Sequence, residues 1–229
     1  MAEQSRPAVQ PIIVGVIPAR LGSTRLPEKM LADICGEPLI VHTVRAAVNS
    51  GVFERVLAAT DHPRIVEVVK RAGYDALLTA ADHPSGTSRV AEVAARIEGD
   101  VFVNVQGDEP LIDAEGLRRL AEAFRQDPDL GMATLCFPLA AADEENPNAV
   151  KVVCDVRRNA LYFSRSLIPH PRRREGFAPL KHIGVYGYRR ETLMRLVQLP
   201  ACPLEQIESL EQLRALYHGI PIRLVDAAR

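Results

Sequence analysis

The sequence has little of what disulfide frameworks, zinc fingers and membrane spans require. Its four cysteines are widely scattered, form no Cys-x-x-Cys pair and have no histidine at metal-finger spacing, which indicates buried thiols in a reducing compartment. No run approaches the roughly 18 apolar residues of a membrane span, and residues 1–11 lack the apolar segment of a secretory signal. We therefore expect a soluble, cytoplasmic protein with no membrane contact.

Excess charge and several common catalytic motifs are missing as well. The formal net charge is −1, which argues against a nucleic-acid partner and means that any cationic site must be local. Neither GxxxxGK[ST] nor GxGxxG occurs, so a P-loop ATPase or a dinucleotide dehydrogenase is disfavoured. No serine or cysteine lies in a recognisable nucleophile motif. A nucleotide bound in some other way stays open.

Strand patterns alternate with amphipathic helix patterns in the first part of the chain. Residues 12–17 form a continuous β-branched run, typical of a strand that is buried on both faces. Further strands are predicted at residues 56–60, 76–78 and 101–105, and helices around residues 38–48, 65–72, 87–97 and 117–124. The helix near residue 87 has Ser85 and Thr87 as candidate N-caps. This alternation predicts an α/β fold with a doubly wound, mostly parallel sheet.

After about residue 131 the pattern changes to short strands joined by turns. Strands are predicted at residues 132–139, 150–156, 160–163 and 183–188, followed by one helix over residues 203–217 and a last strand at 220–225. The strands indicate an antiparallel insertion, which makes the sheet mixed. We predict one domain over 1–229, with a nucleotide-binding half at about 12–130, the insertion at 131–190, and a C-terminal helix and strand at 191–229.

The opening loop, residues 18–29, follows the first predicted strand and gathers cations. Ligands of open parallel sheets bind beyond the carboxyl ends of the strands, where this loop lies. Arg20, Arg25 and Lys29, together with the backbone amides of a Gly-Ser-Thr turn, could cradle a triphosphate. The competing interpretation is a solvated basic turn, because charged residues are mostly at the surface.

A Gly-Asp-Glu-Pro turn follows the strand predicted at residues 101–105. Its Asp108 is a candidate ligand for Mg²⁺, a hard cation that proteins often hold with one or two carboxylates and substrate phosphates. Acidic residues are also common in turns for local hydrogen bonding, so a purely structural role is the alternative. A metal carboxylate here would complement the cations of the opening loop.

Several blocks together resemble one enzyme family across nearly the whole chain. They are Ile-Pro-Ala-Arg-x-x-Ser-Thr-Arg-Leu-Pro-x-Lys at 17–29, Ser-Gly-Thr-x-Arg at 85–89, Asn-Val-Gln-Gly-Asp-Glu-Pro at 104–110, Asn-Pro-Asn-Ala-Val-Lys at 146–151, Tyr-Phe-Ser-Arg at 162–165, His-x-Gly-x-Tyr-Gly-Tyr at 182–188 and Leu-Glu-Gln-Ile-Glu-x-Leu-Glu-Gln-Leu-Arg at 204–214. This pattern resembles the 3-deoxy-manno-octulosonate (Kdo) cytidylyltransferases, or CMP-Kdo synthetases. The opening block alone is shared with CMP-sialic acid synthetases.

The resemblance implies a fold, a reaction and partners. It implies a Rossmann-like nucleotidyltransferase fold and a homodimer built through the antiparallel insertion, which would also carry sugar contacts. The implied reaction takes CTP and Kdo to CMP-Kdo and pyrophosphate with Mg²⁺ as cofactor, for lipopolysaccharide biosynthesis. The two rivals are a CMP-sialic acid synthetase and a non-catalytic nucleotide-binding protein.

The resemblance also implies roles for individual residues. The residues implied for nucleotide binding are Pro18, Ala19, Arg20, Ser23, Arg25, Lys29, Ser85, Gly86 and Arg89. Those implied for catalysis are Arg20, Lys29 and Asp108, and Asp108 is also the implied metal ligand. Those implied for Kdo binding are Gln106, Arg165, His182, Tyr186, Glu211 and Gln212. By pattern alone, Glu211 and Gln212 are expected on a solvated helix face. Pattern alone also places Tyr186 in the core.

Two departures from the family pattern qualify these implications. Pro84 stands where the family often has a glutamine, so a side-chain contact to the base from that position is not expected. The family also continues beyond the last strand into a Gly-Val-Asp-Thr-Pro segment whose aspartate is the second magnesium ligand. The sequence given stops at Arg229, and Asp226 falls too early to replace that aspartate. The expectation is therefore either further residues beyond Arg229 or a form with one metal carboxylate and impaired activity.

Overall fold

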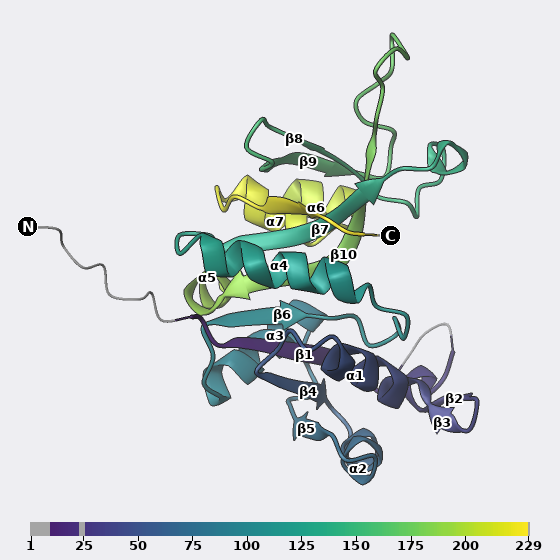
Figure 1. Ribbon diagram of the computed structural model, residues 1–229, viewed down its shortest axis with the longest axis vertical. Helices are drawn as coiled ribbons and strands as arrows, with labels where there is room; N and C mark the ends of the chain where they lie inside the picture. Colours follow the sequence, from purple (N-terminus) through teal and green to yellow (C-terminus); the bar gives the residue numbers. More distant parts are fainter. Residues whose placement is uncertain (1–9, 23–25, 229) are drawn as a thin grey trace, which may run out of the picture.

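A nine-stranded sheet runs through the computed structural model, which describes residues 10–22 and 26–228 (Figure 1). The strands are β1 (Ile13–Ala19), β4 (Arg55–Thr60), β5 (Asp75–Leu78), β6 (Val101–Asn104), β7 (Met132–Pro138), β8 (Lys151–Cys154), β9 (Ala160–Ser164), β10 (Leu180–Arg189) and β11 (Arg223–Asp226). The main order is β11-β7-β10-β6-β1-β4-β5, with β8 and β9 attached to β10. A separate pair, β2 (Asp33–Ile34) and β3 (Glu37–Pro38), was not predicted.

The sheet is mixed and mostly parallel, as predicted. β1 pairs in parallel with β4 on one side and β6 on the other, and it is almost wholly buried, which explains its continuous apolar run. β10 lies antiparallel between β6 and β7, and β11 is parallel to β7. Because β10 runs the other way, its carboxyl-terminal half pairs with β6 and its amino-terminal half extends past the carboxyl end of β6. That edge of the sheet therefore receives loops from both halves of the chain.

Helices cover both faces of the sheet. They are α1 (Leu39–Asn49), α2 (Pro63–Arg71), α3 (Gly86–Arg96), α4 (Ala114–Gln126), α5 (Arg190–Leu196), α6 (Pro203–Glu208) and α7 (Gln212–Tyr217), with short 3-10 turns η1 (Lys29–Leu31) and η2 (Ala141–Asp143). One buried cluster packs the apolar faces of α1, α2 and α4 on the sheet, and a second packs α3, α5 and α7. This two-sided core confirms the doubly wound architecture. No helix in the described part of the chain has both the length and the apolar composition to cross a membrane.

The prediction of one helix over residues 203–217 is wrong. The helix breaks at Ser209, whose φ of 51° is left-handed, and α6 and α7 lie on either side of the break. The Leu210 amide donates to Glu205 O at 3.1 Å and closes the end of α6. α5 was not predicted, and β11 begins at Arg223 instead of residue 220.

The predicted antiparallel insertion is partly built into the main sheet. β7 and β10 are interior strands of the sheet, whereas β8 and β9 form a hairpin that lies beyond them (upper part of Figure 1). β8 also pairs with the start of β10 through Lys151 and Val152. The boundary predicted near residue 131 therefore falls inside one continuous sheet.

Candidate functional site

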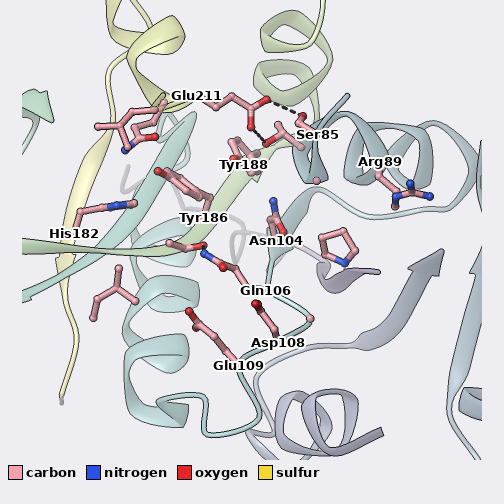
Figure 2. A pocket seen from close by; sticks show the side chains of 18 of the residues that line it. Ser85, Arg89, Asn104, Gln106, Asp108, Glu109, His182, Tyr186, Tyr188 and Glu211 are labelled. Carbon is pink, nitrogen blue, oxygen red and sulfur yellow. Dashed lines mark hydrogen bonds between the residues drawn. The ribbon is translucent and has the colours of Figure 1, made fainter. Parts of the chain in front are cut away.

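A cavity of about 790 Å³ opens at the sheet edge where β1 and β6 end and β10 begins (Figure 2). Twelve residues predicted from the sequence line it: Pro18, Ala19, Arg20, Ser85, Gly86, Arg89, Gln106, Asp108, His182, Tyr186, Glu211 and Gln212. They come from the opening loop, α3, the turn after β6, β10 and the segment around the start of α7. The cavity thus joins most of the residues implied for CTP with most of those implied for Kdo, whereas Lys29 lies outside the lining.

The opening loop and the turn after β6 meet through an ion pair. Lys29 Nζ lies 2.5 Å from Asp108 Oδ2, and each side chain is 36% exposed. A Cβ added at Gly107 would lie only 2.9 Å from the Pro18 carbonyl oxygen, so the close approach of the two loops requires glycine there. Thr43 fixes the same turn by donating to the Gly107 carbonyl at 2.8 Å. Ser23 and Arg25 of the opening loop lie outside the described residues.

Glu109, which the sequence did not single out, also lines the cavity. Burial raises the pKa of its carboxyl group, and the neighbouring charge of Asp108 raises it further. Its position next to Asp108 in the turn is the signal that could have found it. Two adjacent carboxyl groups therefore face the site, and the more exposed one holds the lysine.

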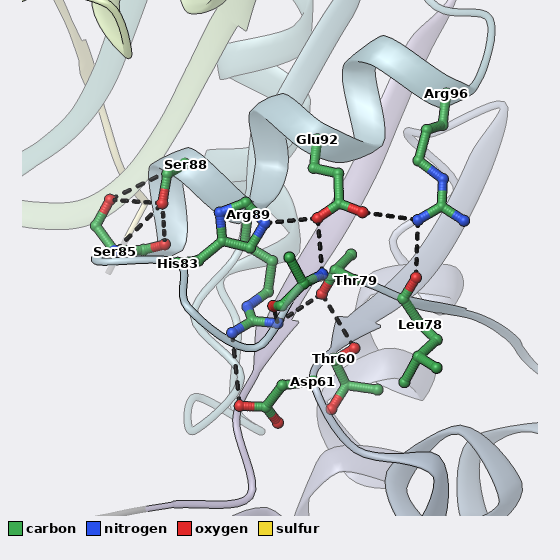
Figure 3. A network of polar contacts seen from close by, with 11 residues as sticks. Thr60, Asp61, Leu78, Thr79, His83, Ser85, Ser88, Arg89, Glu92 and Arg96 are labelled. Carbon is green, nitrogen blue, oxygen red and sulfur yellow. Dashed lines mark hydrogen bonds and ion pairs between the residues drawn. The ribbon is translucent and has the colours of Figure 1, made fainter.

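Arg89 belongs to a buried network that joins three elements (Figure 3). Its side chain is 5% exposed; Nη1 donates to Thr79 Oγ1 at 2.5 Å and to Ala80 O at 3.1 Å, and Nη2 lies 3.6 Å from Asp61 Oδ2. Asp61 Oδ1 in turn accepts from the Leu21 amide at 3.0 Å. Burial lowers the pKa of the Arg89 guanidinium, and the Asp61 charge opposes that shift. Arg89 thus connects α3 to the opening loop through Asp61, which the sequence analysis missed.

A second polar cluster holds the segment before α3 against that helix (Figure 3). Glu92 Oε2 accepts from the Ala80 amide at 2.9 Å and lies 2.6 Å from His83 Nε2, while Glu92 Oε1 accepts from Arg96 at 2.7 Å. His83 lines the cavity. The helix face of α3 therefore fixes the approach of the chain to Ser85.

The amino terminus of α3 is capped and then bridged to the C-terminal part of the chain. Ser85 is the N-cap and forms a capping box with Ser88, while Thr87 lies inside the helix. Glu211 accepts hydrogen bonds from Ser85 Oγ and Thr87 Oγ1, both at 2.8 Å (Figure 2). The expectation from pattern alone, a solvated helix face at Glu211, is wrong because the break at Ser209 turns this residue toward α3.

Three aromatic rings contact one another in edge-on and tilted arrangements beside β10. The ring centroid of His182 lies 5.1 Å from that of Phe163 and 5.2 Å from that of Tyr186. Burial lowers the pKa of His182 to about 3, so its imidazole is neutral near pH 7. His182 Nε2 lies 3.1 Å from Thr134 Oγ1. Tyr186, expected in the core by pattern alone, faces the cavity, and burial raises the pKa of its hydroxyl.

Three buried polar atoms of the cavity lack partners among the described residues. They are Asn104 Oδ1, the Tyr186 hydroxyl and Gln212 Nε2. A buried polar group without a hydrogen bond costs about 1–3 kcal/mol, so such atoms are uncommon in folded proteins. Their concentration in one cavity indicates a polar ligand that supplies the missing bonds.

Arg165 lies away from the cavity, although the resemblance implies that it binds Kdo. Its guanidinium donates to the carbonyls of Glu208 at 2.7 Å, Pro147 at 2.9 Å and Ser209 at 3.3 Å, and it does not line the cavity. Its backbone amide donates to Glu208 Oε2 at 2.9 Å. This placement supports a role in holding the turn between α6 and α7.

Comparisons with known proteins agree with the fold. A family model described as cytidylyltransferase matches residues 14–222. This chain belongs to the cytidylyltransferase family. An Escherichia coli 3-deoxy-manno-octulosonate cytidylyltransferase is 47% identical over 213 residues, which are 93% of this chain and 87% of that protein. A Yersinia enterocolitica protein of the same name is 48% identical over 225 residues, covering 93% of this chain and 89% of the relative.

Solved structures extend the likeness to three dimensions. The structure of a CMP:2-keto-3-deoxy-manno-octonic acid synthetase complexed with CTP matches with a TM-score of 0.92 at 47% identity, over 95% of this chain and 90% of that one. A cytidylyltransferase from Leptospira borgpetersenii, 17% identical, shares the fold with a TM-score of 0.62 over 95% of this chain and 77% of its own. The resemblance found in the sequence is thereby confirmed.

Proposed function

We propose that this cytidylyltransferase transfers CMP from CTP to Kdo and releases pyrophosphate. The observation that carries the proposal is that one cavity is lined by most of the residues implied for each substrate. The relatives at 47–48% identity are named for this reaction, and a matched structure is a complex with CTP. A CMP-sialic acid synthetase remains the rival within the class.

Cationic side chains of the opening loop and the amino terminus of α3 bind CTP. Arg20 and Lys29 face the phosphates of CTP, with Ser23 and Arg25 proposed for the same group from the sequence. Ser85 and Gly86 lie near the nucleoside, where a Cβ on Gly86 would approach the Pro18 ring to 3.3 Å. Arg89 acts through Asp61 on the opening loop instead of contacting the phosphates.

On the sugar side, Kdo lies among polar groups from several elements. Gln106 donates to the Gly184 carbonyl at 3.1 Å, which orients its amide beside β10. His182 and Tyr186 form the aromatic wall, and Glu211 and Gln212 exchange hydrogen bonds with sugar hydroxyls. Arg165 holds the turn that presents Glu211, so we propose a positioning role for it.

The chemistry needs positioning and charge stabilisation more than covalent catalysis. The anomeric hydroxyl of Kdo attacks the α-phosphorus while the bond to pyrophosphate breaks in line with it. Arg20 and Lys29 offset the negative charge that collects on the phosphate oxygens. A neutral His182 can accept a hydrogen bond from the sugar or donate one to it, without adding charge beside the attacking hydroxyl.

We propose Mg²⁺ as the cofactor, with Asp108 as its ligand. The described residues contain no group of three or more His, Cys, Asp or Glu side chains that could hold a metal by themselves. One carboxylate plus substrate phosphates is nevertheless a usual magnesium site, and Asp108 stands half-exposed at the cavity. Bound Mg²⁺ would neutralise phosphate charge and lower the pKa of the attacking hydroxyl. Asp226, the last residue of β11, does not fit this role, because its carboxylate pairs with Arg158.

The assembly and setting complete the proposal. We propose a homodimer formed through the insertion that carries the β8–β9 hairpin, a cytoplasmic location, and a role in lipopolysaccharide biosynthesis. Leu161 on β9 is an exposed large hydrophobic side chain of this hairpin, and such a residue suits a contact between subunits. Sedimentation of the purified protein would test the dimer directly.

Pyrophosphate release distinguishes the candidate functions. The protein is incubated with Mg²⁺ and CTP, with Kdo or sialic acid as acceptor, and each other nucleotide replaces CTP in parallel. We expect release with CTP and Kdo alone. Release with sialic acid but not Kdo would replace the substrate assignment, and CTP binding without release under any condition would favour a non-catalytic nucleotide-binding protein.

A further inference from the structure

Asn104 is the last residue of β6, and it lies on the floor of the cavity between the two substrate sides (Figure 2). The residue is 9% exposed. None of the described residues forms a hydrogen bond with its side-chain carbonyl oxygen, Oδ1. A buried amide that served only the fold would be expected to have a partner, because nearly all buried polar groups in folded proteins do.

The neighbours of Asn104 place its amide on the nucleotide side of the floor. In the sheet it pairs with Val16 of β1 on one side and Tyr186 of β10 on the other. A Cβ added at Gly86 would lie 3.6 Å from Asn104 Nδ2 and 3.3 Å from the Pro18 ring. The amide therefore shares one small space with Pro18 and Gly86, both assigned to the nucleotide.

We propose that Asn104 is a further ligand-contacting residue, whose side-chain oxygen accepts a hydrogen bond from an N–H or O–H donor of the nucleoside of CTP. The inference rests on the proposed function. The donors that a cytosine nucleoside offers are its exocyclic amine and its ribose hydroxyls. The phosphates are excluded as partners of this oxygen, because ionised phosphate oxygens only accept. Kdo has unpaired partners of its own on the far side, in Tyr186 and Gln212.

The proposal predicts opposite effects on stability and on binding. Asn104→Leu keeps the approximate size of the side chain and removes the unpaired oxygen. We expect the ligand-free variant to melt no lower than the wild type, while its dissociation constant for CTP rises about tenfold or more. A residue with a merely structural role would show the reverse, with a lower melting temperature and unchanged affinity.

Asn159→Leu is the matched control, because both the nitrogen and the oxygen of the Asn159 side chain form hydrogen bonds away from the cavity. Asn159 Nδ2 donates to Asp155 at 3.2 Å, and its Oδ1 accepts from Arg223 at 3.1 Å. We expect this control to melt at a lower temperature and to bind CTP as the wild type does. Asn104→Ala serves as a second variant in case leucine disturbs the packing.

Calorimetric titration with CTP, UTP and dideoxy-CTP then identifies the donor. If the amine is the donor, the variant loses affinity for CTP and dideoxy-CTP but not for UTP. If a ribose hydroxyl is the donor, it loses affinity for CTP and UTP but not for dideoxy-CTP. Equal losses for all three ligands, wild-type affinity for CTP, or melting as low as the control in both Asn104 variants would overturn the proposal. Failure of the wild type to bind CTP would instead refute the proposed function.

Discussion

Replacing Asp61 should weaken both the fold and the nucleotide site, because its two carboxylate oxygens serve two different elements. Oδ1 accepts from the Leu21 amide at 3.0 Å, and Oδ2 lies 3.6 Å from Arg89 Nη2 on α3. Arg20, the residue before Leu21, lines the cavity. Asp61→Ala therefore removes the link through which α3 holds this part of the opening loop in place.

The size of the effect follows from the burial of the pair. The side chains of Arg89 and Asp61 are 5% and 17% exposed, and removing one partner of a buried ion pair costs about 3–5 kcal/mol. Arg89 keeps its bonds to Thr79 and Ala80, which favours the lower end of that range. The lost bond from Leu21 adds about 1 kcal/mol. We expect Asp61→Ala to lower the free energy of unfolding by about 4 kcal/mol, and Asp61→Asn by about 2 kcal/mol because it keeps an acceptor for Leu21.

Urea unfolding and steady-state kinetics together test this reasoning. Asp75→Ala is the control, because Asp75 pairs with Arg55 at 2.9 Å but is 56% exposed, and such pairs contribute about 1 kcal/mol or less. The KM for CTP should rise in both Asp61 variants, and more in Asp61→Ala, while the KM for Kdo stays near the wild-type value. A stability loss no larger than that of Asp75→Ala would refute the buried link. An unchanged KM for CTP would refute its role in positioning.

Other perturbations test separate parts of the site. Lys29→Ala and Asp108→Ala should each lower kcat/KM by about 100-fold. The double variant should lower kcat/KM by less than the product of the two single losses, because the two side chains form an ion pair. A loss equal to that product would contradict their pairing. Arg165→Ala should raise the KM for Kdo and also lower the unfolding midpoint, since its guanidinium holds the carbonyls of Glu208 and Ser209; a KM effect with unchanged stability would point instead to direct contact with the sugar acid. His182 has a folded-state pKa of about 3, below the ordinary 6.5, so the unfolded chain binds a proton that the folded protein does not. The stability that His182 contributes is therefore present above pH 6.5 and is lost as pH falls toward 3, by at most about 1.4 kcal/mol per unit. Denaturation at pH 7.5 and 5.5 should show the difference between wild type and His182→Gln shrinking on acidification, and a constant difference would contradict a neutral imidazole.

The regular part of the fold could be predicted from the sequence because its patterns are local. The continuous apolar run of β1 and the helical spacing of α1 each follow from burial on one or both faces. The break at Ser209 could not be predicted, since a serine carries no intrinsic preference for left-handed backbone. It is supported from outside the helix: Glu208 accepts from Ser164 at 2.7 Å, and Arg165 donates to the carbonyls on both sides of the break.

Some site residues could be predicted from their place in the sequence, whereas others are recognised only from contacts between distant elements. The opening loop and Asp108 stand directly after strands, so their meeting at one sheet edge follows from parallel topology. Asp61 also follows a strand, but its role depends on a buried arginine from α3 and an amide from the opening loop. In the sequence Asn104 is an ordinary residue at the end of a strand. Only the structure shows that its side-chain oxygen has no hydrogen-bond partner among the described residues.

Glu211 links the start of α3, proposed for the nucleotide, to the side of the cavity proposed for the sugar. Its carboxylate accepts hydrogen bonds from Ser85 and Thr87 at the start of α3. A carboxylate has about four acceptor positions, so two remain for hydroxyl groups of a sugar. A sugar bound there would therefore be joined through one side chain to the residues nearest the nucleoside. Because the break at Ser209 sets the direction of Glu211, the interruption between α6 and α7 is what brings this carboxylate to the start of α3.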